Sequence, residues 1–211
     1  MSEDLARQEF LALMREMEHR PIHVSHVAQL ALQMFDGLLP LHNLGPRERL
    51  ILEGAGHLHD IGHKFDSTDG GEGHHKQSAR LISQRPWQHF TPREVAIMAL
   101  VARYHRKSPP DLQHSEFAAL PEPERVIVEK LSALLRLADS LDRNHEQFVD
   151  RVTPEIHPEK IIFRLEANGP VLREVIAAHK KGELAIIVFR RSLVFMLNDQ
   201  IIDPAAPPWR W

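Results

Sequence analysis

The chain of 211 residues contains no cysteine. Disulfide bonds and thiolate metal sites are therefore excluded, so any bound metal must be held by histidine and carboxylate side chains. The sequence also lacks an excess of positive charge, with a formal net charge of −3 when histidine is counted as neutral. We therefore expect no nucleic-acid partner, and an anionic ligand would have to be attracted by local charge.

Long hydrophobic runs are missing as well. No apolar run approaches the roughly 18 residues that a membrane-spanning helix needs. The first seven residues, Met-Ser-Glu-Asp-Leu-Ala-Arg, lack the basic start and apolar stretch of a signal peptide. We expect a cytoplasmic protein with no membrane contact. The length suffices for one sizeable core, or for a core with a small appendage.

Helix-forming patterns predict a mainly α fold over residues 1–148. Apolar side chains between Val27 and Leu38 recur at the spacing of an amphipathic helix, which Pro21 opens and Gly37 and Pro40 end. Thr91 begins a further helix as its N-cap, followed by proline and a glutamate three positions on. The predicted helices cover residues 4–19, 21–37, 46–60, 74–84, 91–106 and 121–147, with loops at 63–73 and 107–120.

The pattern changes after Asp150. Residues 151–155 and 160–166 contain short β-favouring runs, and residues 170–181 are typical of a helix closed by Gly182. Residues 184–197 are apolar, and periodicity leaves helix and strand equally open there. The tail over 204–211, with three prolines and two tryptophans, is expected to be peripheral. The prediction is a helical domain, 1–148, with a small C-terminal α+β appendage, 149–211.

Fifteen histidines are many for a chain of this length. The most informative run is Gly-His-Leu-His-Asp-Ile-Gly-His at residues 56–63. An adjacent His59 and Asp60 at a helix end can place an imidazole nitrogen and a carboxylate oxygen on one metal ion, and Gly62 lets the chain turn away. The series predicts a metal centre for phosphate chemistry, with these candidate ligands in chain order: His23, His59, Asp60, His74 or His75, His105 and Asp139.

Each candidate also has a purely structural interpretation. His23 lies within an apolar helical stripe and could be a core histidine bonded to backbone or to a carboxylate, and the His-Asp pair could cap a helix. Adjacent histidines cannot face the same side of a helix, so only one of His74 and His75 can point inward. On the last predicted helix of the helical region, the apolar period favours Asp142 over Asp139 as the buried carboxylate.

Basic residues surround His105 in the sequence. Arg103, Arg106 and Lys107 could hold phosphate oxygens and offset the charge that develops in the transition state, and Lys76 is a further candidate. By themselves, such residues are also typical of a solvated helix end.

Proton transfer has three candidates near the His-Asp pair. His63 could be a metal ligand, a proton shuttle or an ordinary loop residue. His63, Asp66 or Asp69 could protonate the leaving group.

The ordered residues resemble a known family. His23 with Val27, His59 with Asp60, and Asp139 match the HD superfamily of metal-dependent phosphohydrolases. The sequence is most similar to the C-terminal HD-type region of the exopolyphosphatase/guanosine-pentaphosphate phosphatase family, over about residues 15–197. The blocks that carry this similarity are Leu-Ala-Leu-Gln-Met-Phe-Asp (30–36), Leu-His-Asp-Ile-Gly-His (58–63), His-His-Lys-Gln-Ser-Ala-Arg-Leu-Ile (74–82), Arg-Tyr-His-Arg-Lys (103–107) and Leu-Leu-Arg-Leu-Ala-Asp-Ser-Leu-Asp-Arg (134–143).

The resemblance implies a helical HD-domain fold with metal held between helices. It assigns the first metal to His23, His59, Asp60 and Asp139, and thereby favours Asp139 over Asp142. It also implies a second metal at His74 and His105, with Asp60 as the bridge, and it favours His74 over His75. The cofactor would be one or two divalent ions, drawn from Mn, Fe, Co, Ni, Zn or Mg.

Two departures limit what the resemblance carries over. The actin-like region with which exopolyphosphatases hydrolyse their substrate is not among these residues, so that activity is not transferred. Cyclic-dinucleotide phosphodiesterases of the superfamily have lysine where this chain has His63, so their substrate is not favoured.

The resulting expectation is a phosphohydrolase that uses a metal-activated water on a nucleotide or other small phosphoester or phosphoanhydride. Asp60, His63, Arg106 and Lys107 are the expected catalytic residues. Substrate would be bound by Lys76, Arg103, Arg106 and Lys107. The alternative is a non-catalytic module that binds polyphosphate or a nucleotide and regulates a partner. A homodimer is also expected.

Overall fold

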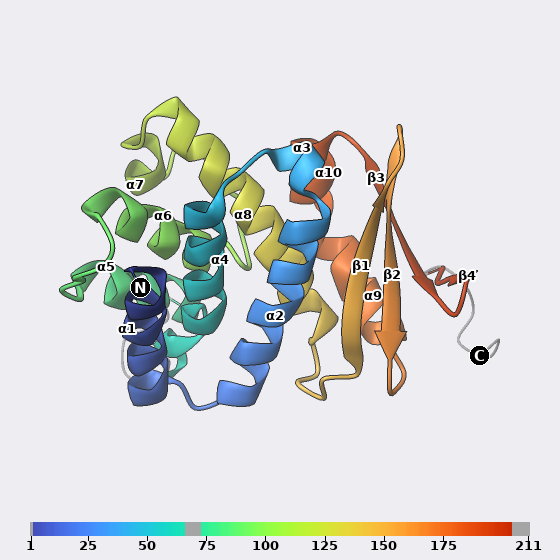
Figure 1. Ribbon diagram of the computed structural model, residues 1–211, viewed down its shortest axis with the longest axis horizontal. Coiled ribbons are helices and arrows are strands. Elements are labelled where there is room, and N and C mark those ends of the chain that lie inside the picture. Colours follow the sequence, from blue (N-terminus) through green and yellow to red (C-terminus); the bar gives the residue numbers. More distant parts are fainter. Residues whose placement is uncertain (1, 66–72, 204–211) are drawn as a thin grey trace.

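The computed structural model of the chain describes residues 2–65 and 73–203, and it has a mainly helical body with a small sheet at one end (Figure 1). The elements of the helical body are α1 (Ser2–Met17), α2 (Pro21–Gly37), α3 (Leu39–His42), α4 (Pro46–Leu58), the 3-10 helix η1 (Ile61–Phe65), α5 (His74–Gln84), α6 (Pro92–Arg103), α7 (Ser115–Ala118) and α8 (Glu122–Leu141). The C-terminal elements are β1 (Val149–Ile156), β2 (Lys160–Ala167), α9 (Leu172–Lys181), α10 (Glu183–Phe189), β3 (Ser192–Leu197) and β4 (Gln200–Ile201). This architecture confirms the predicted fold class.

The helices begin where local chemistry favours a helix start. Proline occupies the first turn of α2, α4, α6 and α8, where its missing N–H would have had no helical partner. The predicted cap of α6 is present: the Thr91 hydroxyl accepts from the Glu94 backbone N–H, and the Glu94 carboxylate accepts from the Thr91 backbone N–H. These starts fix where the first turn of each helix lies, and the first turn of α2 carries His23.

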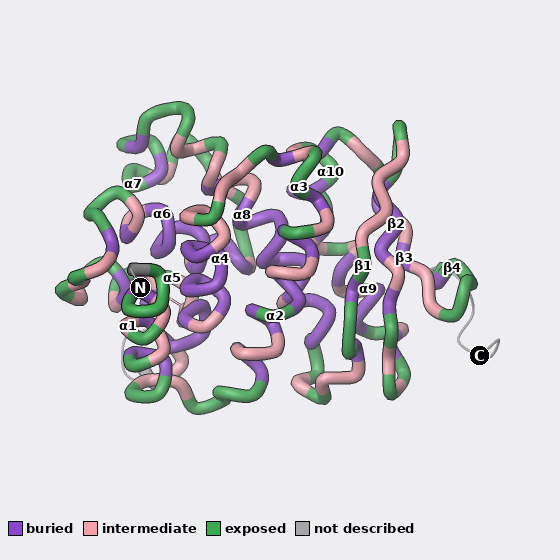
Figure 2. The backbone as a smooth tube through the Cα atoms, in the orientation of Figure 1, coloured by how far each residue is buried: buried purple, intermediate pink, exposed green. Residues whose placement is uncertain are grey.

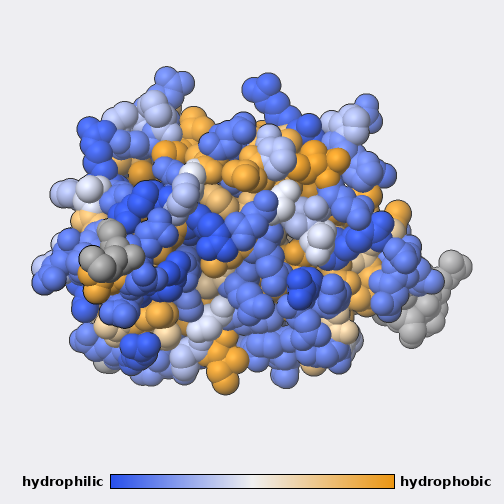
Figure 3. Space-filling view, in the orientation of Figure 1, coloured by the Kyte–Doolittle hydropathy of each residue, from blue (hydrophilic) through white to orange (hydrophobic). Residues whose placement is uncertain are grey.

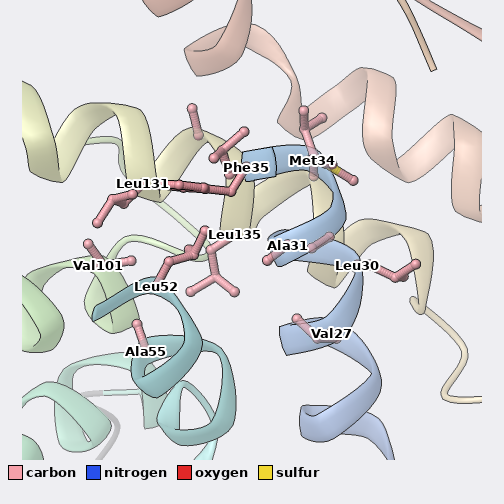
Figure 4. Close-up of a cluster of buried hydrophobic side chains, with 14 of the residues drawn as sticks. Val27, Leu30, Ala31, Met34, Phe35, Leu52, Ala55, Val101, Leu131 and Leu135 are labelled. Atoms are coloured by element: carbon pink, nitrogen blue, oxygen red, sulfur yellow. The ribbon is translucent and has the colours of Figure 1, made fainter. Parts of the chain in front are cut away.

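The core of the helical body lies between α2, α4, α6 and α8. In Figure 4, apolar side chains of α2 face those of the other three helices, among them Leu52 of α4, Val101 of α6 and Leu135 of α8. Figure 2 shows the same arrangement, with buried residues on the sides of these helices that face one another. Helices α2 and α4 approach closely at Gly56, where an added Cβ would lie 2.8 Å from the Ala28 Cα. This contact brings the helix that carries His23 beside the end of α4.

The C-terminal elements form a four-stranded sheet in the order β1-β2-β3-β4. β1 and β2 pair antiparallel, β2 and β3 pair parallel, and β3 and β4 pair antiparallel. The parallel pair needs a crossover, which α9 and α10 supply. Helix α9 packs on α8, and β1 packs on α2. Buried hydrophobic residues form one continuous cluster from the helical body into the sheet; the division into two domains at residues 148 and 149 stays a prediction.

Two predictions along the chain are wrong. The helix expected over 121–147 ends at Leu141, because the Asp142 carboxylate accepts hydrogen bonds from the backbone and side-chain N–H groups of Gln147 and the chain turns there. The loop expected over 107–120 contains the short helix α7. Helix α2 ends at Gly37 as predicted, and the short helix α3 follows at Leu39 with Pro40 near its start.

The ambiguous apolar stretch over 184–197 contains both kinds of element. Its first part belongs to α10, which ends at Phe189, and its second part is β3. Arg190 separates them because its backbone adopts the left-handed conformation, with φ of 52°. The predicted proton donors Asp66 and Asp69 and the tail over 204–211 lie outside the described residues.

The surface gives no sign of a membrane-spanning element. None of the helices among the described residues is long and apolar enough to cross a bilayer. The face in Figure 3 is mainly hydrophilic, with hydrophobic residues in smaller groups.

Candidate metal centre

The predicted ligands lie within or just after five helices, and they come together in the interior of the helical body. His23 comes from the first turn of α2, and His74 is the first residue of α5. His59 and Asp60 directly follow α4, while His105 lies two residues after α6. Asp139 lies in the last turn of α8. The histidines and Asp60 are buried, and the Asp139 side chain is 14% exposed.

A first group of ligand atoms surrounds the Asp139 carboxylate. Its Oδ1 lies 3.7 Å from His23 Nε2 and 3.8 Å from His59 Nε2. Asp60 closes the group, with its Oδ1 3.7 Å from His59 Nε2 and its Oδ2 4.0 Å from His23 Nε2. Ligand atoms of His23, His59 and Asp60 all lie within 4.8 Å of one another, a separation that one metal ion can span.

A second group shares Asp60 with the first. Asp60 Oδ1 lies 3.3 Å from His74 Nε2 and 3.5 Å from His105 Nε2, and its Oδ2 lies 3.6 Å from His63 Nε2. Ligand atoms of Asp60, His63 and His74 also fall within 4.8 Å of one another. The His63 ring stacks on the His74 ring at 3.6 Å between centroids. The structure thus brings His63 into contact with the second group.

Of the adjacent histidines, the structure places His74 at the carboxylate. The His75 ring lies 6.1 Å from the His74 ring and 6.5 Å from the His105 ring, edge-on to both. Burial, and after it the charge of Arg106, lowers the pKa of His75 to about 4.

In three histidines, the Nδ1 atom makes a hydrogen bond on the side of the ring that faces away from the centre. Nδ1 of His59 donates to the Gly56 carbonyl at 2.7 Å, and Nδ1 of His105 donates to the Ala102 carbonyl at 2.7 Å. Nδ1 of His23 donates to Asp142 Oδ2 at 2.7 Å. Metal-binding histidines characteristically donate their second ring N–H to a carbonyl or carboxylate in this way. Each bond leaves Nε2 as the nitrogen that faces the centre.

The facing nitrogens of the first group have no hydrogen-bond partner. His23 Nε2 and His59 Nε2 are both buried and unpartnered among the described residues. Orphaned polar atoms in a protein interior are costly, and a metal ion would satisfy both. His42 shows the ordinary alternative: its Nε2 donates to the Phe35 carbonyl at 2.7 Å and its Nδ1 accepts from the Leu44 N–H at 3.0 Å, so that no ring nitrogen remains for a ligand.

The charges at the centre favour a cation. Burial alone would raise the pKa of Asp60, but the neighbouring His59 side chain keeps it well below its usual value. Burial opposes protonation of His23, yet the neighbouring Asp139 and Asp142 carboxylates raise its pKa to about 9. The carboxylates therefore draw positive charge to the position that a metal ion would take. Burial holds the pKa of His105 well below its ordinary value, so this imidazole stays neutral and able to bind metal.

Asp139 and Asp142 occupy opposite sides of His23. Asp139 lies near Nε2 and Asp142 at Nδ1, so the apolar period and the family resemblance each singled out a carboxylate that contacts this ring. Asp142 is buried and also accepts from Gln147. Its role is to hold the His23 ring.

We expect Asp142→Asn to lower metal affinity by about 10–100-fold, because the amide is a weaker acceptor for the His23 Nδ1–H and can donate instead. Competition with a chromogenic chelator measures the change. Asp150→Asn makes the same change at an exposed position of β1 and should not reproduce this loss. Unchanged affinity in Asp142→Asn would contradict the role assigned to the carboxylate.

A cleft of about 650 Å³ opens over the centre, and Asp60, His74, His105 and Asp139 all line it. Arg106 and Lys107 lie in its wall, as predicted for residues that hold phosphate. One Arg106 N–H group also contacts His74 Nε2 at 2.9 Å.

Lys181 is a further residue at the centre that sequence reasoning missed. It ends α9, and its ammonium group donates to Asp139 Oδ2. The charge of Lys181 keeps the pKa of Asp139 well below its usual value despite burial. His145, also missed, stacks on the His23 ring at 3.8 Å between centroids. No local motif marks either residue: Lys181 lies 42 positions after Asp139, and His145 lies in the irregular segment after α8.

Two predicted substrate-binding residues are not brought to the cleft. Lys76 and Arg103 line a separate groove between α5 and α6. The Arg103 guanidinium donates to Glu116 at 3.0 Å. Their role in substrate binding stays a prediction, and the structure lends it no support.

Comparison with known proteins supports the similarity to the exopolyphosphatase/guanosine-pentaphosphate phosphatase family. The model of the family described as Ppx/GppA phosphatase, domain III, matches residues 11–179. A search of curated proteins finds no significant match. The family match covers α2 to α8 in full and α9 as far as His179, and therefore every predicted metal ligand. The chain belongs to the Ppx/GppA phosphatase domain III family.

Proposed function

We propose that the protein is an HD-type metal-dependent phosphohydrolase that acts on a nucleotide or another small phosphoester or phosphoanhydride. The observation that carries the proposal is the set of three imidazoles whose Nδ1 atoms are held by a carboxylate or carbonyl while their Nε2 atoms face the carboxylates of Asp60 and Asp139. Simple anion binding requires arginine and lysine, and it does not explain buried histidines oriented in this way.

The residues fit one or two divalent ions. His23, His59, Asp60 and Asp139 would hold the first, and Asp60, His74 and His105 the second, with His63 as a further ligand or a proton carrier. Nitrogen and carboxylate donors suit Mn, Fe, Co, Ni or Zn, and Mg to a lesser degree. When bound, the metal supplies a Lewis acid and lowers the pKa of coordinated water from 15.7 towards about 7.

The chain's own residues supply orientation and charge. Arg106 and Lys107, in the wall of the cleft beside His105, bind phosphate oxygens and offset the negative charge of the transition state. His63, with its Nε2 3.6 Å from Asp60 Oδ2 and its ring 30% exposed, moves a proton between the centre and solvent. Asp60 links the two ligand groups and orients the atoms around both.

A second candidate function is a non-catalytic module that binds nucleotide or polyphosphate. The arginine and lysine side chains of the cleft favour this second function, because they can attract a phosphorylated ligand without hydrolysing it. A module that only binds anions does not explain why the buried Nε2 atoms of His23 and His59 are oriented toward the centre without a hydrogen-bond partner. The hydrolase therefore explains more of the structure.

Metal removal tests the proposal. Elemental analysis of freshly purified protein should find one to two equivalents of transition metal. Hydrolysis of p-nitrophenyl phosphate, its diester, pyrophosphate and nucleoside triphosphates should stop after chelation and return when Mn, Fe, Co or Ni is added. Protein that takes up none of these ions, while still binding phosphate chains, would overturn the hydrolase in favour of the binding module.

A further inference from the structure

A second pocket, of about 380 Å³, lies between α8, α10 and the loop that follows α6, and none of the predicted metal ligands lines it. Its volume is within the range of pockets that hold small molecules. Ile187 of α10 is 71% exposed in this lining, so its side chain is available to a ligand. The apolar residues of the lining come from all three segments: Pro109, Pro110, Val126, Leu184, Ile187 and Val188.

Arg136 brings a buried positive charge to this pocket. It is only 9% exposed, and its terminal nitrogens donate to the Tyr104 carbonyl at 2.9 Å and the Lys107 carbonyl at 3.0 Å. Its Nε has no hydrogen-bond partner among the described residues. Burial lowers the pKa of Arg136, and the charges of Asp139 and Glu183 offset this only from beyond ion-pair distance. A carboxylate in the pocket would give the buried guanidinium the charge partner that it lacks.

Negative charge lines the same pocket at Glu129 of α8 and Glu183 of α10. Neither side chain makes a hydrogen bond or an ion pair within the described parts of the chain. Burial raises the pKa of Glu129, so water compensates its charge incompletely. Lys130 and Arg190 also line the pocket, and with Arg136 they nearly balance the two carboxylates. The lining therefore suits a ligand that carries both signs of charge better than it suits a polyanion, which the glutamates would repel.

Arg136 also connects this pocket to the metal centre. Its two carbonyl acceptors, at Tyr104 and Lys107, flank His105 and Arg106 in the sequence. Lys107 has a left-handed backbone, with φ of 58°, which is uncommon for a residue with a side chain. A ligand that pairs with Arg136 therefore acts on the side chain that holds this turn.

We propose that the pocket between α8 and α10 binds a small apolar α-amino acid, which acts as an effector of the metal centre. The ligand carboxylate pairs with Arg136, and its ammonium group lies toward Glu129 and Glu183. Its apolar side chain packs on Ile187 and the two prolines. Binding requires neither metal nor hydrolysis, so the pocket is independent of the proposed function.

The first test compares ligands that each lack one charge. L-leucine carries both charges, isocaproate lacks the ammonium group, and isoamylamine lacks the carboxylate. Titrations of the full chain with labelled isoleucine methyl groups, followed by nuclear magnetic resonance, measure the affinity of each. Leucine should bind at least about tenfold more tightly than either analogue, because each analogue leaves one charge of the pocket uncompensated. The methyl signal of Ile187 should shift, and that of Ile22, on α2, should not.

Matched variants test the position of the site. Arg136→Gln would remove the carboxylate partner but would also free two carbonyls of the turn, so the rim of the pocket is the safer target. Ile187→Ser and Ile22→Ser change helical isoleucines that are 71% and 70% exposed, and both variants should fold. Ile187→Ser should weaken leucine binding at least about fivefold, and Ile22→Ser should bind as the wild type. Equal binding by these two variants, or an analogue that binds as tightly as leucine, would overturn the amino-acid site.

Competition with a chromogenic chelator, with and without saturating leucine, tests the connection through Arg136. Bound leucine should change Mn affinity by at least about fivefold, because both ligands act on the same turn. Unchanged Mn affinity would overturn the effector role. If leucine binds a protein that takes up no metal, the pocket stands and the proposed hydrolase fails. If the metal-loaded protein hydrolyses phosphoesters but binds no leucine, the hydrolase stands and the pocket fails.

Discussion

Asp60→Ala is expected to abolish metal binding and hydrolysis while the helical fold survives. Asp60 is the carboxylate that both ligand groups share, with oxygens 3.3 Å from His74 Nε2 and 3.7 Å from His59 Nε2. Its removal takes one donor from each group, and it takes from His74 and His105 the carboxylate that they share. The first group would keep Asp139, whose second oxygen Lys181 already occupies.

Two measurements check this expectation without relying on activity. Elemental analysis should find metal in the wild type and none in the variant. Added Mn should raise the melting temperature of chelated wild type, because a ligand that binds only the folded state stabilises it, and should leave the melting temperature of Asp60→Ala unchanged. Glu159→Ala removes an exposed carboxylate between β1 and β2 and should match the wild type. Full metal content or full activity in Asp60→Ala would refute the assignment of the centre.

Gly62→Ala is expected to destabilise the fold and to disturb the second ligand group. A Cβ at Gly62 would lie 2.2 Å from the His74 carbonyl oxygen and 2.6 Å from the Ser78 backbone nitrogen. Both are backbone atoms, so the start of α5 must shift. Overpacking of this kind typically costs about 1–3 kcal/mol, and rigid backbone neighbours favour the upper end. His74 would move with α5, away from Asp60.

Urea unfolding measures the loss of stability, and metal stoichiometry reports on the second group. Gly54→Ala is the matched control: its Cβ would lie 3.1 Å from the Met98 sulfur and 3.1 Å from a Phe10 ring carbon, both in side chains. Alanine also gains about 1 kcal/mol over glycine inside a helix such as α4, which offsets the crowding. The argument fails if Gly62→Ala is as stable as Gly54→Ala and retains the wild-type metal content.

Much of the fold could be predicted because its signals are local. Proline starts, the Thr91 cap and the apolar period of α2 each depend on residues within one or two turns. Predictions failed where a distant contact decided the outcome. Helix α8 ends earlier than predicted, and the Asp142 carboxylate that follows it binds His23, 119 positions away in the sequence. The apolar stretch over 184–197, which periodicity left open, is divided by the left-handed backbone of Arg190.

By itself, the sequence determined the chemistry available at the candidate centre. The absence of cysteine left only imidazole and carboxylate donors, and the order of His23, His59-Asp60 and Asp139 predicted which ones. His23 is recognisable because it stands in a local helical pattern that points it inward, whereas Asp139 was singled out by the family resemblance against the apolar period.

Only the tertiary structure decided how these side chains are held and what else reaches them. Asp142 belongs at Nδ1 of His23, Lys181 binds Asp139 from a helix 42 positions further on, and α9 turns a basic face to the cleft. Lys76 and Arg103, which the sequence grouped with the centre, lie in another groove. The physical reason is that spacing along one helix defines a face, whereas the partner of that face depends on how helices pack.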